Sequence, residues 1–319
     1  MPERLLNFGS SPSVAGTPCR GAARGLPTGF EILRYPASSA GGPLRALLGQ
    51  GGRTVILKSC WKDRLLEAGV EDPERLAAGP LVTGWLEGGR TRHARLRFEG
   101  EEWVLKEYRR GGVLGRWNSS RYWVRSRFFE ELRVAALAEA AAVATAEVLA
   151  LVLERAGAGS VRAWLLTRFI PGVRPLHQCF GDPFEGDIFH AAGRVVFRMH
   201  HAGIDHSDLH LGNIVGSFDA DGPHAYIVDW DRARCRAGGT WNPNANLVRL
   251  WRSVEKGRHL AGRQNGKADA TPRARSRSVR AFVRGYFSGR PDDLRKARAY
   301  FRRRALVLGA RTLLWRTKR

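Results

Sequence analysis

The sequence is poor in cysteine, in acidic side chains and in uninterrupted hydrophobic runs. Its four cysteines lie far apart and form no C-x-x-C pair, which disfavours a disulfide framework or zinc knuckle and favours a reducing compartment. The longest apolar stretch, residues 134–153, is interrupted by Glu139 and Glu147, which favours a soluble helix running into a strand over a membrane span. The first residues show no continuous apolar core, so we expect no secretory signal.

The shortage of acidic residues is concentrated at the end of the chain. The sequence has 53 Lys and Arg against 30 Asp and Glu, a net charge of +23. Residues 232–319 hold 25 of the basic and 4 of the acidic residues, so +21 falls there. This indicates a polyanionic or acidic partner. Nucleic acid is disfavoured, because the arginines lack interleaved aromatics and no helix-turn-helix or zinc-finger spacing is present.

The arginine run at residues 302–304, which apolar residues follow, has two interpretations. It is typical of a cationic amphipathic helix lying on an anionic membrane surface. It is equally typical of a terminal helix that closes a domain with a solvated arginine face. Both alternatives stay open.

The pattern along the 319 residues predicts an α+β chain in two lobes. Strand patterns separated by turns begin near Gly84 and predict an antiparallel meander, which a helix and two more strands follow. A Pro-Gly break at residues 169–172 marks the expected lobe boundary. We therefore expect a loosely ordered leader (1–44), a helical N-terminal extension (45–79), a small lobe (80–168) and a larger, mostly helical lobe with basic C-terminal helices (169–319).

Residues 206–213 carry the most informative motif, H-x-D-L-x-x-x-N. Asp208 lies five residues before Asn213, and Asp229 stands at the end of an apolar run sixteen residues after Asn213. A kinase-type phosphoryl-transfer site needs one carboxylate at the acceptor hydroxyl, and an amide oxygen and a second carboxylate that hold Mg²⁺ on the nucleotide phosphates. We expect His206 to be a structural histidine of this loop. A zinc site is disfavoured, because the histidines lack ligand spacing.

The other parts of a kinase core occur upstream in the expected order. Lys106 ends a predicted strand and suits the phosphate-pairing lysine, and Glu131 on the next helix suits its partner. Lys58 competes with Lys106 but lies 73 residues before Glu131. Glu130 competes with Glu131 and projects about 100° away from it on the helix.

Four segments closely resemble the lipopolysaccharide core kinases of the Kdo kinase family. They are residues 104–112 (VLKEYRRGG), 127–133 (RFFEELR), 206–213 (HSDLHLGN) and 226–232 (YIVDWDR). The resemblance spans about residues 70–235 and implies a bilobal protein-kinase-like fold that uses ATP and Mg²⁺ to phosphorylate an inner-core sugar. It implies Lys106 as the phosphate-binding lysine, Glu131 as its partner and Asp208 as the catalytic aspartate. It also implies Asn213 and Asp229 as the metal ligands.

Two departures from the protein-kinase pattern matter. Asp229 is followed by Trp230 and Asp231 rather than by Phe and Gly, which favours a small-molecule or glycolipid acceptor over a regulated protein kinase. The glycine-rich loop is reduced to Gly88 and Gly89, whose backbone N–H groups would cradle phosphate with help from Arg90.

The motifs predict ATP·Mg²⁺ in the cleft between the lobes, and the resemblance implies Kdo as the most favoured acceptor. A glycolipid of the Kdo-lipid A type carries carboxylates and phosphates that suit the basic tail. We therefore expect a protein bound to the cytoplasmic face of the inner membrane. Two alternatives stay open: a kinase of the same fold acting on heptose, an aminoglycoside or another small hydroxyl compound, and a non-catalytic nucleotide-binding pseudokinase.

Overall fold

The computed structural model describes residues 26–35, 52–88, 91–109, 122, 126–157, 159–236, 243–264 and 272–295. Within these ranges the chain divides into two compact units. The sheet unit covers the described residues of Ala23–Ala140 and Thr145–Pro171. The helix unit covers Ala141–Ala144 and the described residues of Gly172–Arg319. The two units separate between Pro171 and Gly172, inside the Pro-Gly break of residues 169–172.

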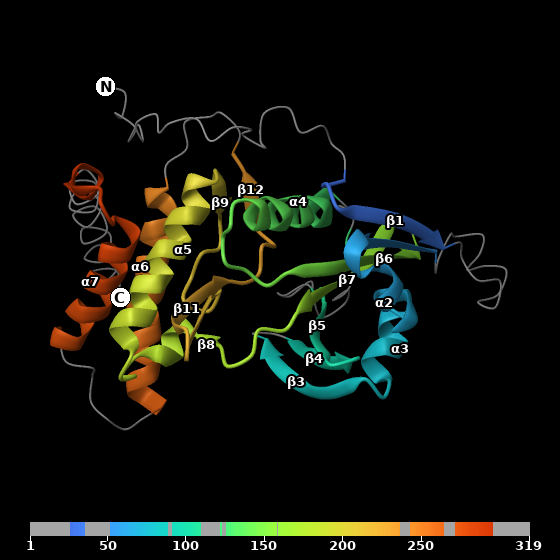
Figure 1. Cartoon of the computed structure of the whole chain (residues 1–319), viewed down its shortest axis with the longest axis horizontal. Helices are drawn as coiled ribbons and strands as arrows, with labels where there is room; N and C mark the ends of the chain where they lie inside the picture. Colours follow the sequence, from blue (N-terminus) through green and yellow to red (C-terminus); the bar gives the residue numbers. More distant parts are fainter. Residues whose placement is uncertain are drawn as a thin grey trace, which may run out of the picture. The chain divides into compact units, whose positions relative to one another are not determined.

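An antiparallel sheet of seven strands forms the sheet unit (Figure 1), with the order β1-β2-β6-β7-β5-β4-β3. Its strands are β1 (Phe30–Tyr35), β2 (Arg53–Lys58), β3 (Val82–Gly88), β4 (Thr91–Phe98), β5 (Glu101–Glu107), β6 (Val148–Gly157) and β7 (Ser160–Arg168). Its helices are the 3₁₀ turn η2 (Ser59–Trp61), α2 (Lys62–Glu67), α3 (Pro73–Ala78) and α4 (Ser126–Ala140). The predicted meander is confirmed, since β3 pairs with β4 and β4 pairs with β5.

Two strands that precede residue 80 extend this sheet beyond the segment expected to form the small lobe. β2 pairs with β6, placing Arg53 opposite Glu154, and β1 pairs with β2. β1 itself lies inside the segment predicted to be a leader, of which residues 1–25 and 36–44 lie outside the described residues. The pairing of β2 with β6 joins residues 101 positions apart, so no local pattern could reveal it.

Helix α4 covers one face of the sheet, and α2 and α3 cover the other (Figure 1). Successive residues of a strand point to opposite faces. Leu105 of β5 is buried in a core with Leu65 of α2 and Leu76 of α3. Tyr108, directly after β5, packs instead against Phe128 of α4 with ring centroids 4.9 Å apart. Lys106 lies between Leu105 and Glu107 on β5 and therefore shares the α4 face with Tyr108.

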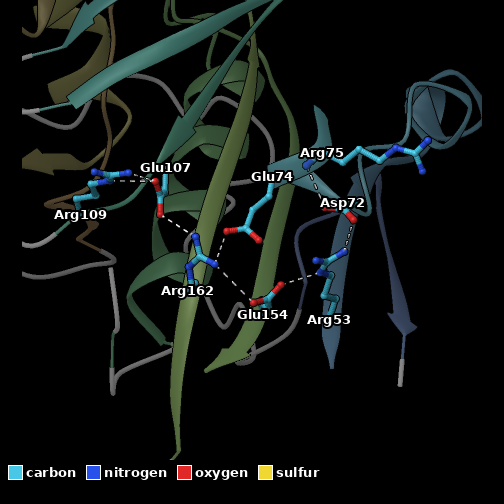
Figure 2. A network of polar contacts seen from close by, with 8 residues as sticks. All are labelled: Arg53, Asp72, Glu74, Arg75, Glu107, Arg109, Glu154 and Arg162. Atoms are coloured by element: carbon cyan, nitrogen blue, oxygen red, sulfur yellow. Dashed lines mark hydrogen bonds and ion pairs between the residues drawn. The ribbon is translucent and has the colours of Figure 1, made fainter. Parts of the chain in front are cut away.

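A network of ion pairs lies on the face that carries α3 (Figure 2). The guanidinium of Arg162 is 2.5 Å from a carboxylate oxygen of Glu74 on α3 and 3.2 Å from one of Glu107 on β5. It also lies 3.8 Å from Glu154 on β6, which binds Arg53 of β2 at 2.8 Å. The network thus connects α3 to β2, β5, β6 and β7.

The helix unit combines short strands with three longer helices. Its elements are β8 (Arg174–Pro175), the 3₁₀ turn η4 (Leu176–Cys179), α5 (Glu185–His201), β9 (Ile204–His206), β10 (Ile214–Asp219), β11 (Gly222–Ile227), β12 (Ala233–Cys235), α6 (Asn244–Gln264) and α7 (Pro272–Tyr286). The strands form two small antiparallel sheets, β11-β10-β8 and β12-β9. The α+β composition predicted from the sequence is confirmed.

Helices α5 and α7 approach each other closely because glycines face each other across their contact. A Cβ atom at Gly193 of α5 would collide with the carbonyl oxygen of Phe282, and one at Gly285 of α7 would collide with that of His190. The buried Nδ1 atom of His200 lies 2.7 Å from the Tyr286 hydroxyl, which joins the same two helices by a hydrogen bond.

In the described part of the chain, no helix combines the length and hydrophobicity needed to cross a bilayer. Residues 296–319, which include the arginine run at 302–304, lie outside the described residues.

Candidate active site

Two antiparallel strand pairs of the helix unit, the hairpin β10-β11 and the pair β9-β12, bring the predicted catalytic residues together. Asn213 directly precedes β10, and Asp229 lies two residues after the last residue of β11. Because Ile214 of β10 is paired with Ile227 of β11, Asn213 lies next to the strand end that leads to Asp229. On the other side, β9 and β12 pair at His206 and Ala233, so the loop after β9 starts beside the segment that follows Asp229. The two segments of the predicted motif therefore lie side by side.

Asn213 connects these two segments by hydrogen bonds. Its side-chain Nδ2 donates to the main-chain carbonyl of Asp208 at 3.1 Å. Its main-chain carbonyl accepts a hydrogen bond from the N–H of Val228 at 2.9 Å, and its own N–H donates to His210 at 3.0 Å. Since the amide nitrogen binds the carbonyl of Asp208, the amide oxygen Oδ1 is the atom that Asn213 can offer to a cation.

Asp229 has a backbone conformation that is rare outside glycine, with φ of +70°. Its carboxylate Oδ1 accepts a hydrogen bond from the N–H of Asp231 at 3.3 Å, and its side chain is exposed while Trp230 is buried. Strained conformations of non-glycine residues persist where the surroundings hold them and concentrate at functional sites. The local structure thus keeps a carboxylate at the surface beside the Asn213 loop.

His206 is a buried, neutral support of the loop. It is fully buried, and its Nδ1 accepts a hydrogen bond from the main-chain N–H of Asp208 at 3.4 Å. Burial lowers the pKa of His206 from its ordinary value of 6.5 to about 4, although the neighbouring carboxylates of Asp229 and Asp208 act in the opposite direction. Its ring also packs on Trp230, with centroids 5.5 Å apart. These contacts support the prediction of a structural role rather than that of a general base.

Helix α6 supports the same loop through contacts that the sequence motifs do not predict. The hydroxyl of Ser253 accepts a hydrogen bond from the N–H of Leu211 at 3.0 Å, inside the motif. Asn246 donates to Asp205 at 2.9 Å, and Arg236 donates to the same carboxylate at 2.7 Å. Burial raises the pKa of Asp205, but the hydrogen bonds from Asn246 and Arg236 outweigh it and leave the pKa lowered. The partners lie 31 to 42 residues apart, so no local spacing signals them.

In the sheet unit, Lys106 and Glu131 occupy the elements expected for them. Lys106 lies on β5 opposite Leu165 of β7, and its Nζ is 4.9 Å from the ring centroid of Tyr108. Glu131 is buried on α4, with only 2% of its surface exposed. Glu130 is more exposed and binds Arg133 at 3.0 Å along the helix. The burial of Glu131 supports its choice over Glu130.

Lys58, the alternative to Lys106, has a structural role. Its ammonium donates hydrogen bonds at 2.7 Å to Glu139 of α4 and at 2.7 Å to Glu147 before β6. Burial lowers the pKa of Lys58, but the two carboxylates outweigh that effect and raise it. This double ion pair connects β2 to α4 and favours Lys106 as the phosphate-binding lysine.

The glycine-rich turn is only partly described. Gly88 is the last residue of β3 and pairs with Thr91 at the start of β4. Gly89 and Arg90, which complete the expected phosphate loop, lie outside the described residues.

The oxygen donors of the loop fit a cation that arrives bound to nucleotide phosphates. Among the described residues, no group of three or more His, Cys, Asp or Glu side chains could hold a metal ion by itself. Mg²⁺ is usually bound through one or two protein oxygens together with substrate phosphates and water. Asn213 and Asp229, on adjacent strand ends, supply such a set. Zinc prefers nitrogen and sulfur ligands, which are absent from this set.

Comparisons with known proteins indicate one family. Residues 83–286 match the model of the lipopolysaccharide kinase (Kdo/WaaP) family. A 3-deoxy-D-manno-octulosonic acid kinase of Xanthomonas campestris pv. campestris (strain B100) is 32% identical over 259 residues, covering 80% of this chain and 100% of that protein. The enzyme of the same name from Vibrio cholerae serotype O1 is 29% identical over 158 residues, or 48% of this chain and 65% of the relative.

One solved structure, WaaP in complex with acyl carrier protein, aligns with 80% of this chain and 98% of its own. The two share 19% sequence identity, and the TM-score is 0.49.

Proposed function

Because the chain belongs to the lipopolysaccharide kinase (Kdo/WaaP) family, we propose that it transfers the γ-phosphoryl group of ATP to a hydroxyl of Kdo in the lipopolysaccharide inner core. As a member, the chain is a phosphotransferase with a hydroxyl acceptor and a kinase of the lipopolysaccharide core. Its α+β fold is of the protein-kinase-like class. The relatives that carry the name of a Kdo kinase support the choice of Kdo.

The observation that carries the proposal is the hydrogen bond from Asn213 to the backbone of Asp208. It fixes a potential cation ligand and a potential proton acceptor on one loop, beside the strand end that carries Asp229. We propose that the Asp208 carboxylate binds the acceptor hydroxyl. It takes the proton of that hydroxyl as the hydroxyl oxygen bonds to phosphorus. The bond from phosphorus to the β-phosphate oxygen breaks, and ADP leaves. Positioning and charge stabilisation would supply most of the rate.

Asn213 and Asp229 would hold the divalent metal ion that kinases use, and we propose that this ion is Mg²⁺. When bound, it neutralises charge on the transferring phosphoryl group. The hard oxygen donors of the two side chains support this choice. His206 keeps the loop in place while it remains uncharged near neutral pH.

Lys106 would pair with nucleotide phosphates, with Glu131 as its positioning partner. The burial of Glu131 on α4 and the engagement of Lys58 by two carboxylates support this assignment. The N–H groups of Gly88 and Gly89, with Arg90, are proposed to line the same phosphates.

We further propose that the enzyme works on the cytoplasmic face of the inner membrane. The net charge of +23 suits an anionic surface and a glycolipid acceptor with carboxylates and phosphates. Binding to vesicles of phosphatidylglycerol and phosphatidylcholine should weaken when salt rises from about 0.05 to 0.3 M. Vesicle affinity that does not change with salt would contradict an electrostatic attachment.

An acceptor panel tests the proposed function. Purified protein with ATP and Mg²⁺ is incubated with Kdo-containing lipid A, with heptosylated core and with an aminoglycoside, and phosphorylated products are measured by mass spectrometry. We expect an added phosphate on Kdo. Phosphate on heptose or on the aminoglycoside alone would contradict the choice of Kdo. Binding of ATP without turnover on any acceptor would indicate a pseudokinase.

A further inference from the structure

The side chain of Tyr108 lies between the two elements that carry the proposed phosphate-binding pair. Its ring centroid is 4.9 Å from Nζ of Lys106, which precedes it by two residues on the same face of the strand. An ammonium within about 6 Å of an aromatic centroid is attracted by the negative face of the ring. The ring thus provides a defined resting position for the lysine head group.

The Tyr108 ring is itself held on several sides. Its centroid is 4.9 Å from that of Phe128 on α4 and 6.5 Å from that of Tyr122, and only 3% of the residue is exposed. The main-chain N–H of Tyr108 donates to Ala163 of β7 at 3.0 Å, which continues the sheet pairing past the end of β5. These contacts pack the ring between the sheet and α4.

Phe128 connects this contact to the helix face that carries Glu131. The two residues are three positions apart on α4, both are buried, and residues at this spacing share a face. A shift of α4 would therefore be transmitted through Phe128 to Tyr108, and from there to the ammonium of Lys106.

The face of an aromatic ring restricts where a lysine ammonium rests. The Tyr108 ring attracts the Lys106 ammonium in this way, in addition to any carboxylate that the ammonium contacts. A lysine side chain also loses substantial rotamer entropy when it is fixed, and prior orientation reduces that loss on binding.

We propose that Tyr108 is a positioning residue that pre-orients the Lys106 ammonium for nucleotide phosphate and couples it to α4. The proposal rests on the assignment of Lys106 to the phosphates in the proposed function. It predicts that the Tyr108 ring strengthens ATP binding only through Lys106.

A double-mutant cycle tests this coupling. The affinity for ATP in the presence of Mg²⁺ is measured by calorimetry for the wild type, Tyr108→Leu, Lys106→Met and the double variant. We expect Tyr108→Leu to weaken binding about fivefold in the wild-type background, and less than about twofold in the Lys106→Met background. Tyr108→Phe keeps the ring and should bind within about twofold of the wild type.

Phe98→Leu is the control for loss of packing in the same unit. Phe98 packs on Trp103 with ring centroids 5.8 Å apart, in the core on the face of the sheet opposite α4. We expect it to lower the melting temperature and leave ATP affinity unchanged. Equal losses of affinity in both lysine backgrounds, or an equal loss in Phe98→Leu, would show that Tyr108 acts only through packing and would overturn the proposal.

The outcome also separates this proposal from the proposed function. Wild-type protein that fails to bind ATP would overturn the kinase assignment and, with it, the role of Tyr108. Wild-type protein that binds ATP, together with a folded Tyr108→Leu variant of unchanged affinity, would overturn the role of Tyr108 alone.

Discussion

The side-chain amide of Asn213 donates a hydrogen bond to the main-chain carbonyl of Asp208 at 3.1 Å. This hydrogen bond joins the two motif residues that lie five positions apart. It also orients the amide, so that the nitrogen binds the loop backbone and the oxygen can bind a cation. One side chain thereby sets both the shape of the loop and one ligand of the proposed metal site.

Asn213→Asp separates these two roles. The variant keeps an oxygen donor but replaces the N–H that Asp208 accepts with a carboxylate oxygen, which would repel the carbonyl. We expect kcat to fall on the order of a hundredfold, while the Mg²⁺ concentration for half-maximal rate rises less than in Asn213→Ala. Steady-state kinetics over a Mg²⁺ series measures both effects. Equal metal dependence in the two variants would contradict the assignment of Oδ1 as a ligand.

Ser253→Ala tests the brace from α6. The substitution removes the hydroxyl that accepts the N–H of Leu211 at 3.0 Å and leaves that donor without its partner. We expect a loss of about 1 kcal/mol in the free energy of unfolding and a fall in kcat with little change in the KM for ATP. Ser253→Thr keeps the hydroxyl and should recover most of kcat. Unchanged kcat in Ser253→Ala would show that the brace does not position the loop.

Arg162→Met tests the ion-pair network of Figure 2. The change removes the cation shared by Glu74, Glu107 and Glu154 and leaves three carboxylates close together. Because the Arg162 side chain is 24% exposed, we expect about 2 kcal/mol of destabilisation, below the range for a fully buried pair. Arg92→Met is the control, since Arg92 is 70% exposed and lies 3.6 Å from Glu87. Equal urea midpoints for the two variants would contradict a structural role for the network.

Two buried histidines should make the folded state less stable at acidic pH. Burial lowers the pKa of His200 to about 3 and that of His206 to about 4, both below the ordinary value of 6.5. A histidine with a lowered pKa contributes its full stability above about pH 6.5, and loses it as the pH falls toward the folded-state pKa. We expect urea unfolding to show a loss of roughly 2 kcal/mol for each histidine between pH 6.5 and 5.

His200→Asn isolates one of these contributions. The variant removes a titrating group beside the Tyr286 hydroxyl, and its free energy of unfolding should fall less steeply between pH 6.5 and 5 than that of the wild type. His201→Asn, which removes an exposed imidazole from the same helix, is the control for a general effect of substitution on α5. If the free energy of unfolding of His200→Asn fell as steeply between pH 6.5 and 5 as that of the wild type, the assignment of acid sensitivity to His200 would be contradicted.

The sequence was sufficient to predict the local parts of this site. Asp208 and Asn213 lie on one loop, and the hairpin that connects Asn213 to Asp229 is short, so motif spacing and strand pattern place the three residues near one another. The β3-β4-β5 meander was predictable for the same reason, since its strands are consecutive and joined by short turns.

Long-range contacts could not be predicted from local patterns. Lys58 finds its two carboxylates 81 and 89 residues away, and this distinguishes it from Lys106 only once the fold is known. β1 follows a segment rich in glycine and proline, and becomes a strand because β2 supplies its hydrogen-bonding partners. The brace from Ser253 to Leu211 depends on helix packing, which carries no sequence signature.

The most direct test of the catalytic assignment compares wild-type protein with Asp208→Asn in the transfer of labelled γ-phosphate from ATP to Kdo-containing lipid A. The hydrogen bonds that shape the loop use the main-chain N–H and carbonyl of Asp208, so the substitution should preserve the fold and the melting temperature. We predict label on Kdo with the wild type and a rate lower by at least about a hundredfold with the variant. Turnover by Asp208→Asn close to that of the wild type would contradict the account.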